Sequence, residues 1–226
     1  MSVPVIAIDG PSGVGKGTVA KALARKLGWH FLDSGSLYRI LALAARKAGI
    51  SDQDEAAVAA LAPRLNIKFD LHNIDNEKII VDGEDLTPHL RAETTGALAS
   101  VIAVYPAVRA ALLERQRAFR RSPGLVADGR DMGTVVFPDA GLKIFLDATA
   151  DERALRRLNQ LRKAGIAANI AALREEIRER DVRDRSRTVS PLKPADDAVT
   201  IDTTELSAES VLARVEQLIE ARAYAR

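Results

Sequence analysis

Short hydrophobic runs alternate with helical patterns along most of the 226-residue chain. The apolar runs predict five buried strands, at 5–8, 29–32, 125–127, 142–146 and 198–201. Apolar positions at helical spacing predict helices over 19–27, 36–49, 103–121, 151–164, 170–182 and 207–223. Strands that alternate with helical crossovers indicate an α/β protein, with a five-stranded parallel sheet and helices on both of its faces.

Residues 66–91 break this rhythm. The segments IKFDLH and KIIVDG alternate at period two, and NIDN (73–76) separates them. This pattern predicts a small antiparallel β-hairpin, inserted into the α/β layout and extending to about residue 91. The turn-rich stretch SPLKPADD (190–197) is the one predicted linker.

An aspartate closes each predicted strand of the parallel sheet. These residues are Asp9, Asp33, Asp128, Asp147 and Asp202. Ligands of parallel sheets bind beyond the carboxyl ends of the strands, so all five should lie at the binding edge. Aspartate also favours strand-to-loop junctions, and for most of the five we expect this structural reason to suffice.

The segment GPSGVGKGT (10–18) is a near match to the phosphate-loop pattern G-x-x-x-x-G-K-[ST]. Its glycines allow backbone N–H groups to surround phosphate oxygens, and Lys16, expected in an exposed loop, would reach the transferring phosphates. A dinucleotide-binding motif is excluded, because its third glycine would fall on Thr18. The predicted nucleotide-binding residues are Gly10, Pro11, Ser12, Gly13, Val14, Gly15, Lys16, Gly17 and Thr18.

Gly17 departs from the general motif, which places a Mg²⁺-ligating hydroxyl directly after the lysine. A metal would then be held by water and the nucleotide, with a more distant acid or with Thr18 in a shifted role. Asp128 ends the strand expected beside the phosphate-loop strand, so we predict that it is this acid and acts through water.

The net charge of +2, with 47% hydrophobic and 28% charged residues, is that of an ordinary globular protein and gives no general attraction to nucleic acid. Segment 151–187 is more basic, with ten Arg and one Lys against seven acids, which favours a local anionic ligand. The absence of Cys excludes disulfides and thiolate metal sites. The chain has no signal-like start and no apolar run of about 20 residues, so we expect a cytoplasmic protein without membrane partners.

Four further segments carry a family resemblance: LDSGSLYR (32–39), ADGRDMGT (127–134), TVVFPDAGLKIFLDA (134–148) and RERDVRDRSR (178–187). Together with GKGT they resemble the bacterial cytidylate kinases, in family order and over most of the chain. The resemblance implies a P-loop NTPase fold with an inserted antiparallel β element and a helical lid. It also implies transfer of the γ-phosphoryl group of ATP to CMP or dCMP with Mg²⁺, by a protein that we expect to be a monomer.

The resemblance also implies roles for individual residues. The implied CMP-binding residues are Ser34, Tyr38, Arg39, Ser100, Arg109, Arg130, Asp131, Arg180, Asp184 and Arg187. The implied catalytic residues are Lys16, Arg130, Arg153 and Arg157. Structural alternatives remain open: Ser34 as a helix cap, Tyr38 as a core residue, and an exposed ion-pair ladder over 180–187.

The implied regions are a core of 1–34, 92–150 and 188–226, a monophosphate-binding region of 35–91 with its β insertion at about 64–91, and a lid of 151–187. Residue chemistry alone supports only phosphorylation of a small anionic acceptor, so a kinase for another monophosphate stays open. The sequence contains no N-K-x-D motif, which GTP-dependent switches use to bind the base, so this alternative is disfavoured. His30, His72 and His89 have no catalytic context and are interpreted as structural.

Overall fold

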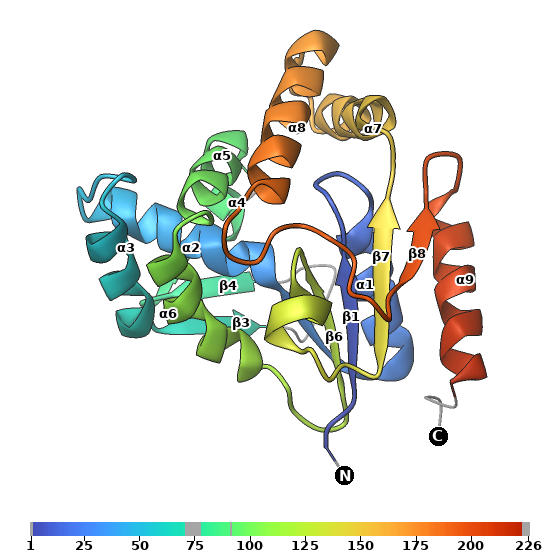
Figure 1. The fold of residues 1–226 in the computed structure, drawn as a ribbon. Helices are drawn as coiled ribbons and strands as arrows, with labels where there is room; N and C mark the ends of the chain where they lie inside the picture. The colour runs from blue at the N-terminus through green and yellow to red at the C-terminus, as the bar shows by residue number, and fades with distance from the viewer. Residues whose placement is uncertain (1, 71–77, 91, 223–226) are drawn as a thin grey trace. The chain divides into compact units, whose positions relative to one another are not determined.

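The computed structural model describes residues 2–70, 78–90 and 92–222 (Figure 1). The predicted turn at 73–76 and His72 lie outside the described residues. The chain forms two compact units, one of Met1–Leu32 with Arg120–Arg226 and one of Asp33–Phe119. The core, monophosphate-binding and lid regions expected from the sequence concern function, and their boundaries stay a prediction.

The first unit is built on a five-stranded sheet. Its strand order is β2 (His30–Asp33), β6 (Leu125–Gly129), β1 (Val5–Asp9), β7 (Leu142–Asp147) and β8 (Val199–Asp202). β1 runs parallel to both β6 and β7, and β7 runs parallel to β8 (Figure 1). The predicted α/β fold with a five-stranded parallel sheet is therefore confirmed.

The two faces of this sheet are covered differently. Ile6 and Ile8 of β1 belong to a buried apolar cluster that also contains residues of α1 (Lys16–Leu27) and α9 (Ala208–Ala221). Side chains alternate along a strand, so Asp9 does not point to the face of Ile8. Asp9 instead contacts a π-helical turn, Met132–Val136, which follows β6.

Helices α7 (Ala150–Lys163) and α8 (Ile170–Arg185) pack against each other and confirm the two helices predicted in the arginine-rich segment (Figure 1). They share a small apolar core of their own, made of Ala154, Leu158, Leu161, Leu173 and Ile177. The side chains of Thr149 and Asn169 cap their N-termini by accepting backbone N–H hydrogen bonds.

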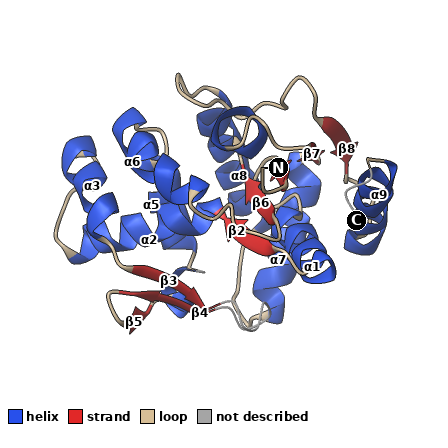
Figure 2. Ribbon diagram, turned by 90° about the horizontal axis from the view of Figure 1, so that it is seen from below, coloured by secondary structure: helices blue, strands red, loops and turns tan. Residues whose placement is uncertain are grey.

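The second unit contains helices α2 (Ser34–Lys47), α3 (Glu55–Leu61), α4 (Thr87–Leu90), α5 (Glu93–Ile102) and α6 (Pro106–Arg117), and a short 3₁₀ turn (Ala62–Arg64). Its small sheet has the order β3 (Ile67–Asp70), β4 (Lys78–Val81) and β5 (Glu84–Asp85), and both pairs are antiparallel (Figure 2). The predicted antiparallel insertion is confirmed, although its third strand was not predicted.

The single helix predicted over 103–121 was wrong in its start. Helix α6 begins at Pro106, whose missing N–H suits the first helical position, and a separate helix α5 precedes it. Within the described ranges, no single helix is long and apolar enough to cross a membrane; α5 and α6 meet that criterion only as a pair, bent by 106°.

Candidate active site

The phosphate loop joins β1 to α1, and its glycines have conformations that other residues would not tolerate. Gly10 has φ 147°, and a Cβ built on it would lie 2.0 Å from the carbonyl oxygen of Leu146. Gly13 and Gly15 have φ values of 80° and 97°, and Gly15 is the N-cap of α1. The glycines therefore allow the backbone to curve tightly into the positive end of α1, where phosphate groups bind.

Lys16 is buried, with 6% of its surface exposed, which corrects the expectation of an exposed side chain. Its Nζ donates a hydrogen bond of 2.8 Å to the carbonyl oxygen of Pro11 and lies 3.9 Å from Oδ1 of Asp128. Burial, and then the positive charge of Arg130, lower the pKa of Lys16 to about 7, against the opposing effect of Asp128. A bound phosphate would favour the protonated form of this amine.

Asp128 lies in β6 near the first turn of α1. A Cβ built on Gly17 would lie 3.3 Å from Oδ2 of Asp128, so a larger residue at position 17 would crowd this carboxylate. No cluster of three or more His, Cys, Asp or Glu among the described residues could hold a metal ion. The donors here fit a cation held chiefly by phosphate and water, with one carboxylate nearby.

Three residues implied for CMP binding form a connected ion-pair network. Arg130 donates from Nε to Oδ2 of Asp184 at 2.9 Å, and Arg187 donates from Nη2 to Oδ1 of the same carboxylate. Asp184 is 1% exposed, so the exposed-ladder alternative is wrong for this residue. Burial opposes its ionisation, but the charges of Arg130, Arg187 and Arg180 prevail and hold the pKa of Asp184 below its usual value.

Two arginines of α7, Arg153 and Arg157, differ in their surroundings. Arg153 is 2% exposed, donates to the carbonyl oxygens of Ala148 at 3.0 Å and Ser12 at 3.1 Å, and forms a two-pronged ion pair with Asp181 of α8. Arg157 is half-buried and donates to Oε1 of Gln160 at 3.1 Å. Arg153 thus joins α7, α8 and the phosphate loop, and Asp181 is a partner that the sequence did not reveal.

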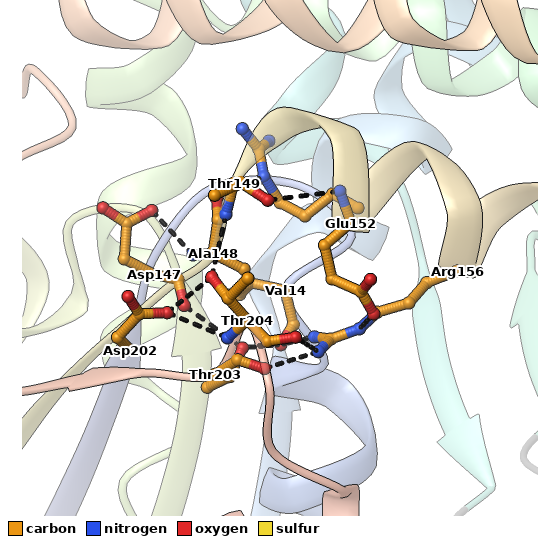
Figure 3. Close-up of polar contacts among 10 residues, drawn as sticks. Val14, Asp147, Ala148, Thr149, Glu152, Arg156, Asp202, Thr203 and Thr204 are labelled. Atoms are coloured by element: carbon orange, nitrogen blue, oxygen red, sulfur yellow. Dashed lines mark hydrogen bonds and ion pairs between the residues drawn. The ribbon is translucent and has the colours of Figure 1, made fainter.

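A second network that the sequence did not reveal connects α7 to the loop after β8 (Figure 3). Thr203, 1% exposed, donates from its backbone N–H to the carbonyl oxygen of Asp147 at 2.8 Å. Arg156 donates to the carbonyl oxygens of Val14 at 3.4 Å and Thr204 at 3.4 Å, and to Oγ1 of Thr203 at 3.2 Å. The carbonyl oxygen of Val14 in the phosphate loop is therefore tied by hydrogen bonds to Arg156 of α7 and to Thr203, which follows β8.

In the second unit, Asp33 rather than Ser34 is the N-cap of α2, and it accepts from the backbone N–H of Ser36 at 3.2 Å. Arg39 donates to the carbonyl oxygens of Leu90 at 2.7 Å and Ala92 at 3.4 Å.

The remaining residues of this unit implied for CMP binding are buried. The Arg109 guanidinium lies 5.7 Å from the centre of the Tyr38 ring and donates to the carbonyl oxygen of Ala103 at 3.1 Å. Ser34 and Ser100 are also buried. Tyr38 and Arg109 thus come together, whereas Arg39 is tied to backbone carbonyls.

The parallel sheet has a glycine-rich loop between β1 and α1, a buried lysine begins that helix, and arginines lie on a pair of helices. These features define a P-loop kinase. Residues 6–221 match the model of the cytidylate kinase family. The cytidylate kinase of Stutzerimonas stutzeri (strain A1501) is 60% identical over 217 residues, which cover 94% of this chain and 93% of the relative. The cytidylate kinase of Photobacterium profundum is 55% identical over 217 residues, which cover 96% and 95%. The chain belongs to the cytidylate kinase family and is a nucleoside monophosphate kinase.

Proposed function

We propose that the protein transfers the γ-phosphoryl group of ATP to CMP or dCMP, which gives ADP and CDP or dCDP. The observation that carries the proposal is a phosphate loop with a buried Lys16, in the same unit as several arginines held by hydrogen bonds. The similar proteins are named cytidylate kinase. The phosphate loop from Gly10 to Thr18 would bind ATP.

The proposed chemistry needs no strong general base, because the accepting oxygen belongs to a phosphate that is already an anion. It needs alignment of the two nucleotides and neutralisation of their negative charges. Lys16, Arg130, Arg153 and Arg157 would supply this positive charge. Arg157 is the more accessible of the two lid arginines, whereas Arg153 would also hold the loop through the carbonyl of Ser12.

We propose that the acceptor is bound by the residues implied from the sequence: Ser34, Tyr38, Arg39, Ser100, Arg109, Arg130, Asp131, Arg180, Asp184 and Arg187. Asp131 would accept a hydrogen bond from the exocyclic amine of cytosine, which uracil lacks. Arg187 would bind the phosphate and sugar of the acceptor nucleotide rather than its base.

Mg²⁺ is the proposed cofactor. It would supply the charge that neutralises the β- and γ-phosphate oxygens when it is bound with ATP. Asp128 is the proposed protein partner, through water, because its carboxylate lies beside Lys16 and Gly17. The hydroxyl of Thr18 is the alternative oxygen ligand.

We further propose a cytoplasmic monomer without nucleic-acid or membrane partners. The small net charge of +2 and the absence of cysteine support this part of the proposal.

The test is an ADP-release assay with CMP, dCMP, UMP and AMP as acceptors. A buried acceptor group left unpaired by UMP costs about 1–3 kcal/mol, so CMP and dCMP should be better acceptors than UMP by roughly tenfold or more, and AMP should be worse still. Equal use of CMP and UMP by the unmodified enzyme would contradict the assignment.

Two variants test which residues determine the preference for CMP over UMP. Asp131→Ala should narrow the CMP-to-UMP ratio, mainly because CMP becomes a poorer acceptor. Arg187→Ala should damage both acceptors alike. An unchanged ratio in Asp131→Ala would remove this residue from base recognition.

A further inference from the structure

Asp9 ends β1 directly before the phosphate loop, and none of the roles proposed above uses it. It is 5% exposed. Its Oδ1 accepts the backbone N–H of Met132 and its Oδ2 accepts that of Gly133, both at 2.8 Å. Both carboxylate oxygens therefore hold the backbone of one short segment, 123 to 124 positions away along the chain.

These two N–H groups belong to the first residues of the π-helical turn Met132–Val136, where backbone donors have no partner within the helical segment. The N-cap position of this turn is Asp131, whose side chain makes no capping hydrogen bond. Asp9 supplies the cap from the neighbouring strand instead. Burial raises the pKa of Asp9 to about 7, whereas the two backbone N–H hydrogen bonds favour its ionised form.

The turn approaches Asp9 closely because position 133 is glycine. A Cβ built on Gly133 would lie 3.4 Å from Oδ2 of Asp9 and 3.1 Å from Cδ of Lys143. Asp9 also lies opposite Gly129 in the β1–β6 pairing, so the carboxylate stands beside the strand end that leads into the turn. The position of segment 129–133 is thus fixed from two sides, by the strand pairing and by the carboxylate.

We propose that Asp9 is a positioning residue for acceptor recognition. It fixes the start of the π-helical turn Met132–Val136, and thereby the position of Arg130 and Asp131, which directly precede this turn. This inference rests on the proposed function, because it assigns Asp9 to the residues proposed to bind CMP.

Asp9→Asn is the sharpest test, since it keeps the size of the side chain but turns an NH₂ group toward one of the two N–H donors. The KM for CMP should rise about tenfold, and the CMP-to-UMP ratio should fall, while the KM for ATP changes less than about twofold. Val215→Ala, a buried position in α9, is the control for loss of stability without loss of the turn.

A double-mutant cycle distinguishes positioning from a merely structural role. If Asp9 acts through Asp131, Asp9→Asn should barely change the CMP-to-UMP ratio of the Asp131→Ala enzyme. The proposal is overturned if the two effects on this ratio add, if ATP rather than CMP binding is impaired, or if both KM values change as in Val215→Ala.

The proposed function and this inference fail in different ways. An unmodified enzyme that does not prefer CMP contradicts the function, whereas a CMP-selective enzyme that Asp9→Asn leaves unaltered contradicts the inference. Should Asp9→Asn not fold, NMR of the unmodified protein serves instead. Couplings across the hydrogen bonds from the amides of Met132 and Gly133 to the Asp9 carboxyl carbon should be observed, and their absence would overturn the proposal.

Discussion

The ammonium group of Lys16 is buried against its own loop, 2.8 Å from the carbonyl oxygen of Pro11. A buried lysine destabilises the fold in proportion to the desolvation of its charge, while its proposed benefit appears only when phosphates are bound. Lys16→Met should therefore lower turnover by about 10²–10³-fold, without lowering the free energy of unfolding. ADP release and urea unfolding measure the two effects.

Lys26 offers a matched control, because it lies on the same helix and pairs at 2.8 Å with Glu216 through a side chain that is 62% exposed. Lys26→Met should retain normal turnover. Near-normal turnover in Lys16→Met would show that the lysine does not serve the phosphates.

Local spacing predicted the phosphate loop and its lysine, because the motif is contiguous. It could not predict residues whose partners are distant along the chain. Asp181 lies 28 positions from Arg153, and Asp9 lies 123 positions from Met132. Asp9 was noticed only as one of five aspartates at strand ends, and most of those needed no role beyond the end of a strand. The partners of Asp9 could be identified only from the structure, in which β1 and β6 lie side by side.

At the scale of elements, the strands and longer helices of the first unit were predictable, since each is a contiguous apolar or helical pattern. The second unit was harder. Segment GALASVIAV (96–104) is almost entirely apolar, so its periodicity did not reveal where α5 ends. The two-residue strand β5 is too short to produce an alternating pattern.

The pairing of α7 with α8 can be tested by a comparison within the chain. Two ion pairs join these helices: Arg153–Asp181, whose side chains are 3% and 16% exposed, and Arg174–Asp151, whose side chains are 46% and 61% exposed. Removing one partner of a buried pair leaves an uncompensated charge. Asp181→Asn should therefore lower the free energy of unfolding by about 3 kcal/mol and speed proteolysis within 150–185.

Asp151→Asn is the control for the same helix pair. Its effect on the free energy of unfolding should stay within about 0.5 kcal/mol, because exposed pairs contribute little. Equal losses in the two variants would mean that the buried pair does not hold the helices together.

At the scale of the whole molecule, a net charge of +2 conceals strong local charge. The first unit surrounds the buried Asp184 with Arg130, Arg187 and Arg180. The sequence indicated an arginine-rich segment and therefore an anionic ligand. It could not show that Asp184, one of the acids among those arginines, is buried. Its partner Arg130 follows β6 and lies 54 positions earlier in the chain.

The stability of the chain should therefore depend on the ionisation of Asp184. Its folded-state pKa lies below the usual 3.8, so the unfolded chain binds the proton more readily as the solution is acidified. The stabilisation is then complete above 3.8 and is lost as the pH falls through the lower, folded-state pKa. Asp184→Asn should lower the free energy of unfolding by about 3 kcal/mol at pH 7, because Arg130 and Arg187, whose side chains are 18% and 4% exposed, lose their counter-charge.

Urea unfolding of the unmodified chain and of Asp184→Asn, at several pH values from neutral to acid, measures this contribution directly. The difference between the two proteins should be constant from pH 7 down to about pH 5, and should shrink below 3.8 as the native carboxylate becomes protonated. Asp202→Asn, which alters an exposed carboxylate hydrogen-bonded to Thr204, should show a much smaller difference throughout. A difference for Asp184→Asn that grows toward acid pH would mean that Asp184 is not held as an anion between the arginines.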